Sequence, residues 1–182
     1  MKACLLVIDM QNDFLSRFNA SERQHLFDRT NELVALCRQK RADIIWIYQT
    51  FKPDLSDAFL EMRDHNIPNV IEGTPGAEIA AALDVQDHDR RLLKKRYSGF
   101  FETPLSTELA QIDPDLLILA GVNTHACIRM TAIDAYQRDF RVVLASDCIS
   151  SPDKEHAAVT LRYMKDKMAR VMANADIANL MG

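Results

Sequence analysis

Short apolar runs alternate with longer amphipathic stretches along this chain. The apolar runs, which are typical of buried strands, cover residues 4–8, 44–48, 116–120 and 141–145. Residues 91–96 predict a weaker, basic strand, and residues 170–172 predict a last short one. The amphipathic stretches predict helices over residues 21–40, 105–111, 124–138 and 152–168, with a final helical turn at 175–180.

This alternation of strands and helices predicts an α/β fold. We expect a three-layer α/β/α arrangement in which a mostly parallel sheet carries helices on both faces. Residues 52–76 interrupt the pattern with three prolines and two glycines, and only residues 55–63 suggest a helical turn there. Long loops in compact domains often line functional sites. We find no domain boundary and predict a single domain over residues 1–182.

Composition and charge exclude several classes of function. Hydrophobic residues make up 48% of the chain and charged residues 26%, with a formal net charge of −4. This balance, without a dense basic run, argues against a nucleic-acid partner. No apolar run approaches the length of a membrane span or signal-peptide core, so we expect a cytoplasmic protein. The four cysteines lie far apart and are expected to be free thiols.

Cys127 is the first candidate for chemistry. It lies between an apolar strand and a predicted helix, with Thr124 as a plausible N-cap. The positive end of a helix lowers the pKa of a nearby thiol, and its unpaired N–H groups can hold an oxyanion. The alternative is a small buried hydrophobic residue, which is the commonest role of a free cysteine.

Two charged residues are expected at the same edge of the sheet, because ligands of such folds bind beyond the carboxyl ends of the strands. Asp9 directly follows the first strand, where desolvation would raise its pKa toward that of a useful general base. Lys95 lies near the end of the basic strand and could pair with the acid. The alternatives are a turn or capping acid for Asp9 and a solvated strand end for Lys95. Asp13 is a weaker candidate that could cap the loop.

Four segments, in order, resemble the isochorismatase-like cysteine hydrolase family across nearly the whole chain. They are residues 6–14 (Leu-Val-Ile-Asp-Met-Gln-Asn-Asp-Phe), 72–79 (Glu-Gly-Thr-Pro-Gly-Ala-Glu-Ile), 95–103 (Lys-Arg-Tyr-Ser-Gly-Phe-Phe-Glu-Thr) and 121–128 (Gly-Val-Asn-Thr-His-Ala-Cys-Ile). The resemblance implies a Rossmann-like fold with a six-stranded sheet and a catalytic triad of Asp9, Lys95 and Cys127. It also implies a cis peptide between Val122 and Asn123, whose N–H joins that of Cys127 in an oxyanion hole.

The resemblance further implies a hydrolase that cleaves a carbon–nitrogen bond through a thioester on Cys127, as in the N-carbamoylsarcosine amidase and ureidoacrylate amidohydrolase branch. Metal-dependent nicotinamidases of the family carry an Asp-x-His pair after the second strand, where this chain has Gln49, Thr50 and Phe51. We therefore predict no metal. No GxGxxG follows the first strand, so we also predict no dinucleotide cofactor. True isochorismatases, which cleave a vinyl ether, lack the cysteine.

Two other functions stay open. The chain could be an ether hydrolase in which Cys127 is a passenger, or an idle family member that serves as a binding or scaffold protein. We expect a small-molecule substrate and a homo-oligomer, either a dimer or a tetramer. Met164, Met168 and Met172 could supply an interface, although a helix core explains them equally.

Several further residues could contact a substrate. The candidates for the pocket are Gln11, Phe14, Phe51, Tyr97, Phe100, His125 and Thr131. Aromatic residues at such places are as often plain core, and His125 could equally face solvent or a partner subunit. Arg129 and Arg162 could bind a substrate carboxylate, but solvent-facing helix positions explain them as well.

Overall fold

Six strands form one sheet in the computed structural model, which describes residues 1–182. In chain order they are β1 (Ala3–Ile8), β2 (Asp43–Gln49), β3 (Arg90–Lys94), β4 (Leu116–Val122), β5 (Val142–Ser150) and β6 (Arg170–Met172). They lie in the order β3-β2-β1-β4-β5-β6, and every neighbouring pair is parallel. The predicted six-stranded parallel sheet is therefore confirmed.

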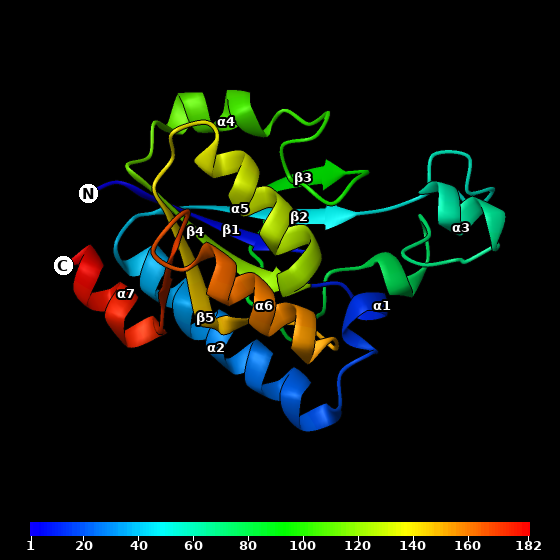
Figure 1. The fold of residues 1–182 in the computed structure, drawn as a ribbon, viewed down its shortest axis with the longest axis horizontal. Coiled ribbons are helices and arrows are strands. Elements are labelled where there is room, and N and C mark those ends of the chain that lie inside the picture. Colours follow the sequence, from blue (N-terminus) through cyan, green and yellow to red (C-terminus); the bar gives the residue numbers. More distant parts are fainter.

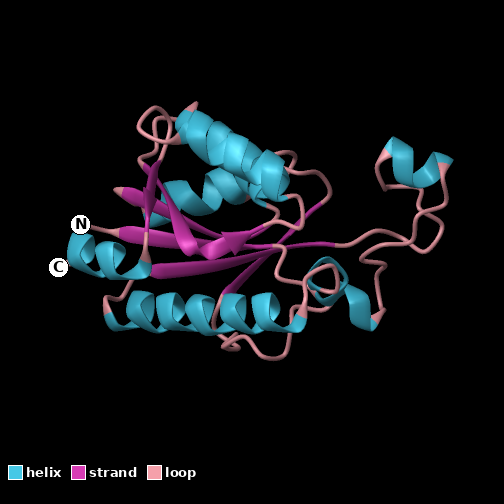
Figure 2. Ribbon diagram, turned by 60° about the horizontal axis from the view of Figure 1, so that its bottom comes forward, coloured by secondary structure: helices cyan, strands magenta, loops and turns pink.

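Helices cover both faces of this sheet (Figures 1 and 2). They are α1 (Asn12–Leu15), α2 (Ala20–Gln39), α3 (Leu60–Asp64), α4 (Leu105–Ile112), α5 (Arg129–Tyr136), α6 (Lys154–Met164) and α7 (Asn174–Met181), with a 3-10 turn η1 (Pro75–Ala77) and a π turn η2 (Thr124–Ile128). Helices α2 and α7 pack into one core, and α4, α5 and α6 pack into the other. The three layers are as predicted. None of the helices has the length and apolar composition that crossing a membrane requires.

The central strand β1 shows why the apolar runs in the sequence are unbroken. Alternate side chains of a strand point to opposite faces of its sheet. Leu5 and Val7 therefore enter the core beneath α2, whereas Leu6 and Ile8 enter the core beneath α4 and α5. Since both faces of a parallel sheet are covered, every position of β1 is buried.

The segment between β2 and β3 forms an arm that carries α3 and projects beyond the sheet (Figure 1). Its base is closed by backbone bonds from the Phe51 N–H to the Val70 carbonyl (3.0 Å) and from the Glu72 N–H to the Phe51 carbonyl (2.8 Å). The Val70 N–H also donates to the Asp13 carboxylate at 2.7 Å. Asp13 thus holds the arm to the body of the molecule, which fits its predicted role in a loop.

Element boundaries differ from prediction mainly in the C-terminal half. The predicted helix over 124–138 opens with the π turn η2, and the predicted helix over 152–168 ends at Met164. Met164 is fully buried, and Met168 and Met172 pack against the two cores. This arrangement accounts for the methionines as core residues, and the oligomeric state stays a prediction.

Candidate active site

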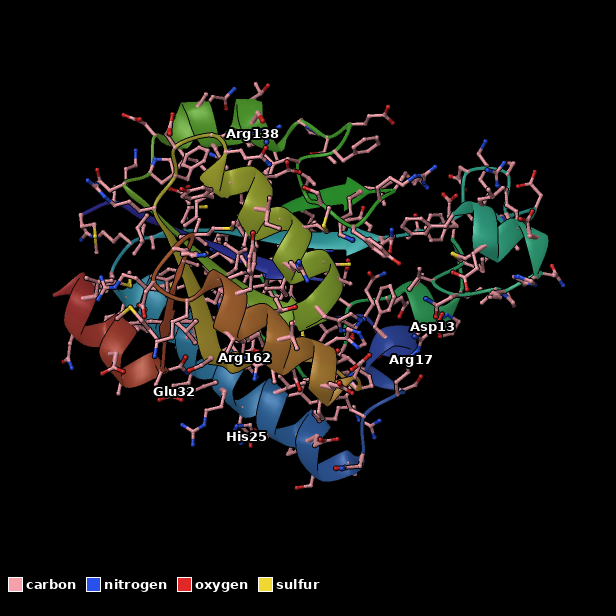
Figure 3. All side chains as sticks on the ribbon, viewed as in Figure 1. Asp13, Arg17, His25, Glu32, Arg138 and Arg162 are labelled. Atoms are coloured by element: carbon pink, nitrogen blue, oxygen red, sulfur yellow. The ribbon has the colours of Figure 1, made fainter.

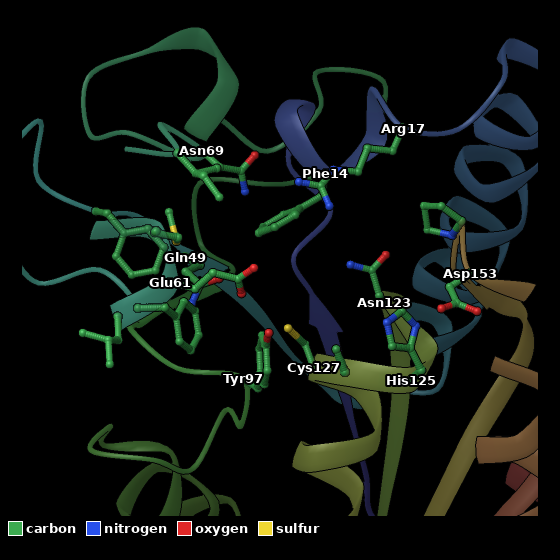
Figure 4. Close-up of a pocket in the computed structure, with 17 residues that line it drawn as sticks. Phe14, Arg17, Gln49, Glu61, Asn69, Tyr97, Asn123, His125, Cys127 and Asp153 are labelled. Carbon is green, nitrogen blue, oxygen red and sulfur yellow. The ribbon is translucent and has the colours of Figure 1, made fainter. Parts of the chain in front are cut away.

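A cavity of about 610 Å³ opens at the carboxyl ends of β1, β2 and β4 (Figure 4). The chain runs from β1 outward to β2 and β3, and then returns to β4 on the other side of β1. Ligands of open α/β sheets bind at such a switch of strand order. Asp9 follows β1 and Cys127 follows β4, so these two predicted residues meet beneath the cavity.

Asp9 owes its position to the turn that ends β1. Its backbone adopts a left-handed conformation with φ 55°, which aspartate tolerates better than most residues. Its N–H donates to the Ile47 carbonyl at 2.8 Å, which ties the turn to β2. The side chain is only 1% exposed. The carboxylate is therefore held inside the protein, where it needs a positive partner.

That partner is Lys94, and the prediction of Lys95 is wrong in this respect. The Lys94 ammonium lies 2.7 Å from Oδ2 of Asp9 and 3.5 Å from Sγ of Cys127. It also donates to the Arg96 carbonyl at 3.1 Å. The side chains of Lys94 and Asp9 are almost completely buried. Asp9, Lys94 and Cys127 thus form one buried cluster.

Lys95 points away from this cluster. Its ammonium donates to the Thr50 carbonyl at 2.5 Å and pairs with Asp57 at 2.7 Å. Both partners belong to the start of the arm, and the Lys95 side chain is 35% exposed. Lys95 therefore braces the arm against the end of β3.

The phase of β3 explains the wrong assignment. Successive side chains alternate between the two faces, so a shift of one residue exchanges the buried and exposed sets. Leu92 and Lys94 face inward, whereas Leu93 is 40% exposed. Because Leu92 and Leu93 are equally apolar, the sequence pattern did not show which of them faces the core.

Cys127 lies in the π turn η2, directly after β4. The Asn123 carbonyl accepts hydrogen bonds from the N–H groups of Ala126 and Ile128, at 3.1 and 3.2 Å, but not from that of Cys127. The wider register thus removes the acceptor that an α-helix would offer the Cys127 N–H. The Val122–Asn123 peptide is cis, as the resemblance implies. The side chain of Cys127 is 3% exposed and lines the cavity.

The charges of the cluster depend on burial. Burial raises the pKa of the Asp9 carboxyl above its ordinary value, although the Lys94 ammonium opposes the shift. Burial also raises the pKa of the Cys127 thiol, and the charge of Asp9 adds to this effect. For Lys94, burial disfavours the charged form, but Asp9 and Cys127 outweigh it and raise the pKa. The raised pKa values favour a charged ammonium on Lys94 and a neutral thiol on Cys127, and Lys94 is the counter-ion that favours the charged form of Asp9.

This charge state corrects the expectation that a helix N-terminus lowers the pKa of Cys127. The effect of a helix dipole is confined to its first turn and reaches about 2 kcal/mol only in favourable geometries. Here the sulfur is almost fully buried and faces a carboxylate. Desolvation and the negative charge of Asp9 together outweigh the dipole.

Of the predicted pocket residues, Phe14, Phe51, Tyr97 and His125 line the cavity. His125 is half-buried, and its Nδ1 lies 2.7 Å from the Ser151 hydroxyl. The rings of Phe51, Phe59 and Tyr97 form a continuous aromatic wall, with centroid distances of 5.8 and 4.8 Å.

Three predicted pocket residues do not line the cavity. The Gln11 side chain is fully buried and binds backbone groups of Gln49 and Ala77. Phe100 packs against Phe140 in the core beneath α4 and α5. The Thr131 hydroxyl accepts the Gly99 N–H at 2.9 Å and so positions the chain after β3. All three side chains are buried in the protein interior and do not contact the cavity.

The sequence did not reveal other residues that line the cavity. They include Arg17, Gln49, Phe59, Glu61, Asn69 and Asp153. Gln49 could have been found, because it directly follows the predicted strand over residues 44–48 and ends the observed strand β2 beside β1. Arg129 and Arg162 do not line the cavity; Arg129 lies over the Tyr163 ring at 5.7 Å. Figure 3 places Arg162 on α6, well away from Arg17 beside α1.

No group of three or more histidine, cysteine, aspartate or glutamate side chains is arranged to hold a metal ion. The residues at the end of β2 are Gln49, Thr50 and Phe51, and Phe51 is fully buried. A carboxamide and a phenyl ring are poor ligands for a transition metal. Independence from metal stays a prediction.

Comparisons with known proteins agree on one family. The family model described as the isochorismatase domain matches residues 3–176. A probable inactive nicotinamidase of Arabidopsis thaliana is 32% identical over 172 residues, which cover 89% of this chain and 87% of that protein. An isochorismatase family protein of Desulfovibrio vulgaris superposes with a TM-score of 0.88 at 26% identity, covering 99% of this chain and 98% of that one.

A third similar protein is a pyrazinamidase of Pyrococcus horikoshii, whose structure was solved in complex with zinc. It has a TM-score of 0.83 and 26% identity, and the match covers 95% of this chain and 99% of that one. An amidase and a probably inactive relative thus both share this fold.

Proposed function

Because the chain belongs to the isochorismatase family of hydrolases, we propose that it hydrolyses a carbon–nitrogen bond of a small amide or ureido compound. The bond would be cleaved through a thioester on Cys127, with no cofactor. The observation that carries this proposal is the buried cluster of Asp9, Lys94 and Cys127 at the base of a small cavity. A nucleophile, a base and a cation that orients them are what covalent acyl transfer requires.

In the first half of the reaction, Cys127 attacks the substrate carbonyl. Since the resting thiol is neutral, Asp9 removes its proton as the sulfur–carbon bond forms. The carbonyl oxygen becomes negative and is stabilised by backbone N–H groups at Asn123 and Cys127. Lys94 stays protonated throughout, and it fixes the orientation of the Asp9 carboxylate.

The tetrahedral intermediate then collapses. The proton held by Asp9 passes to the leaving nitrogen, and ammonia or an amine departs. In the second half, Asp9 takes a proton from water, and the resulting hydroxide attacks the thioester. The thiolate leaves and regains its proton, which restores the resting charges. One carboxyl group therefore acts as base and acid in turn.

The test is a panel of small primary amides, carbamoyl compounds and N-substituted ureas, assayed for release of ammonia or amine. We expect one chemical group to be hydrolysed and a mass increase equal to the acyl group to appear on Cys127 in rapidly quenched samples. Cys127→Ala should lower the rate by about 10³-fold or more. Cys37→Ala is the matched control, because Cys37 is equally buried but lies in the opposite core.

Two outcomes would point to a different function. If Cys127→Ala retains hydrolysis of a vinyl ether while no amide reacts, the protein is an ether hydrolase in which the cysteine is a passenger. If neither class of compound reacts, the protein is an idle member like its probably inactive relative. An acyl adduct on Cys127 would contradict both alternatives.

A further inference from the structure

We propose that Gln49 selects substrates that carry a second oxygen on the nitrogen side of the bond to be cleaved. Its side-chain N–H would donate to that oxygen, which belongs to a carbonyl attached to the leaving nitrogen. The inference rests on the proposed function, since it names the substrate class of the same site. The favoured substrates are acylureas and related ureides.

The sheet places Gln49 beside the reacting groups. Gln49 on β2 is paired in register with Lys94 on β3, so their side chains leave the sheet on the same face. Gln49 is 2% exposed and lines the cavity together with Cys127 and Asn123. In Figure 4, Gln49 lies on one side of Cys127, and Asn123 and His125 lie on the other.

The backbone of Gln49 is fixed by another glutamine. The Gln49 N–H donates to Oε1 of Gln11 at 2.8 Å, and Nε2 of Gln11 donates to the Gln49 carbonyl at 2.7 Å. The same Nε2 donates to the Ala77 carbonyl at 2.6 Å, which ties this strand end to η1. Gln11 therefore uses its side chain to hold Gln49 in place, and it leaves the side chain of Gln49 unused.

The amide group of Gln49 has no hydrogen-bond partner within the protein. Its Nε2 is completely buried, and no oxygen accepts its N–H. The nearby Lys94 does not hydrogen-bond with the Gln49 amide; it pairs with Asp9 and donates to Sγ of Cys127 and to the Arg96 carbonyl. A buried donor without an acceptor is unfavourable, and such groups in native proteins usually have a functional explanation. A ligand oxygen in the cavity supplies that explanation here.

The strand order fixes which part of the substrate reaches Gln49. The strands lie in the order β2, β1, β4, so Asp9 after β1 stands between Gln49 and the nucleophile turn after β4. With the carbonyl oxygen at the N–H groups of Asn123 and Cys127, the leaving nitrogen faces Asp9. A group attached to that nitrogen extends toward Gln49. The unpaired N–H therefore meets the substituent on the leaving nitrogen.

A matched pair of ligands isolates this contact. N-acetylurea and N-ethylurea have the same length, but only N-acetylurea has an oxygen on the carbon attached to the substituted nitrogen. Binding of both is measured by calorimetry to the Cys127→Ala protein, which cannot form a thioester. We expect N-acetylurea to bind about tenfold to a hundredfold more tightly, as is typical of one hydrogen bond to a buried donor.

The preference should disappear when Gln49→Met is added, because methionine fills the same space without an N–H. Gln49→Leu, which also lacks a donor, should abolish it too, and thermal unfolding of both variants checks that they fold. Gln39→Met at an exposed position of α2 is the matched control and should keep the preference.

Equal binding of the two ureas, no binding of N-acetylurea, or an unchanged preference in the Gln49 variants would overturn the inference. Failure of the proposed function gives a different result. In that case the wild-type protein hydrolyses neither compound, although the binding preference and its dependence on Gln49 persist. Hydrolysis that is indifferent to Gln49 would refute the substrate class alone.

Discussion

The Lys94 ammonium forms an ion pair with Asp9 and donates hydrogen bonds to Sγ of Cys127 and to the Arg96 carbonyl. A buried ammonium needs a partner on each side, because water cannot reach it and a buried N–H without an acceptor is unfavourable. The arrangement places the carboxylate and the sulfur on one cation. It thereby determines the distance and orientation of base and nucleophile before any substrate arrives.

Replacing Lys94 should therefore be far more harmful than replacing its neighbour. Lys94→Met leaves the Asp9 carboxylate buried without a counter-ion, which typically costs about 3–5 kcal/mol and raises the pKa of Asp9 further. We expect a lower urea midpoint and a loss of hydrolysis at neutral pH. Lys95→Met removes a partly exposed ion pair and should cost less than about 1 kcal/mol.

The comparison of these two lysines decides which one belongs to the site. Equal losses of activity in both variants would contradict the assignment of Lys94. Urea denaturation run in parallel separates a catalytic loss from simple unfolding. A folded but inactive Lys94→Met protein is the expected result at low denaturant.

At the scale of elements, the contact between β1 and β4 positions both reacting groups. Gly121 has φ 118°, and a β-carbon at this position would lie 1.9 Å from the Ile8 carbonyl oxygen. The pairing of β4 with β5 also shifts between Leu119 and Gly121. The close approach brings the turn that carries Cys127 against the end of β1, where Asp9 begins its own turn.

Gly121→Ala should consequently destabilise the protein and disturb the site. The methyl group meets backbone rather than a mobile side chain, and the left-handed conformation adds strain, so we expect a loss of at least about 2–3 kcal/mol. Gly73→Ala is the control, since Gly73 also has a positive φ, of 78°, but nothing lies within 4 Å of its added carbon. Its cost should be about 1 kcal/mol. Thermal unfolding measures both, and equal shifts would contradict the role of the β1–β4 contact.

The sequence predicts best the strands that are buried on both faces, because each of them appears as an unbroken apolar run. The strands β1, β2 and β4 are buried on both faces, so their apolar runs show where they lie. Asp9 could be placed because it directly follows such a strand, and Cys127 because it lies in the turn between β4 and the next predicted helix. Lys94 could not be placed, because Leu92 and Leu93 are adjacent and equally apolar, and the sequence therefore does not show which side chains of β3 point inward.

The π turn and the role of Gln11 depend on hydrogen bonds that the local sequence pattern does not show. The π turn η2 has the residue spacing of an ordinary helix start, and only its hydrogen bonds distinguish it. Gln11 resembled a pocket residue because it lies in the motif beside Asp9. Its real partners, Gln49 and Ala77, are 38 and 66 residues away in the chain.

At the scale of the whole molecule, the sheet separates two cores, and all four cysteines are buried in them. Cys37 and Cys148 lie in the core with α2, and Cys4 and Cys127 lie in the other. Burial raises the pKa of Cys37 and of Cys148 to about 12. It also raises the pKa of Cys4 and Cys127. The folded protein thus keeps four neutral thiols at a pH where the unfolded chain would ionise them.

This difference predicts a loss of stability in mild alkali. A thiol whose pKa is higher in the folded state holds its proton there, while the unfolded chain loses its own above about pH 8.5. Stability therefore falls as pH rises through that value, by up to about 1.4 kcal/mol per pH unit for each thiol. Urea denaturation under reducing conditions between about pH 7.5 and 9.5 would measure the slope.

Comparison with Cys37→Ala removes the contribution of all other titrating groups, because only one thiol differs. The slope of the variant should be shallower by about 1.4 kcal/mol per pH unit at the alkaline end. The same comparison with Cys127→Ala tests the charge state of the site. If Cys127 were already a thiolate in the folded protein, its removal would not make the slope shallower, and Asp9 would have no proton to take from it. A shallower slope in both variants is the result that the neutral thiol requires.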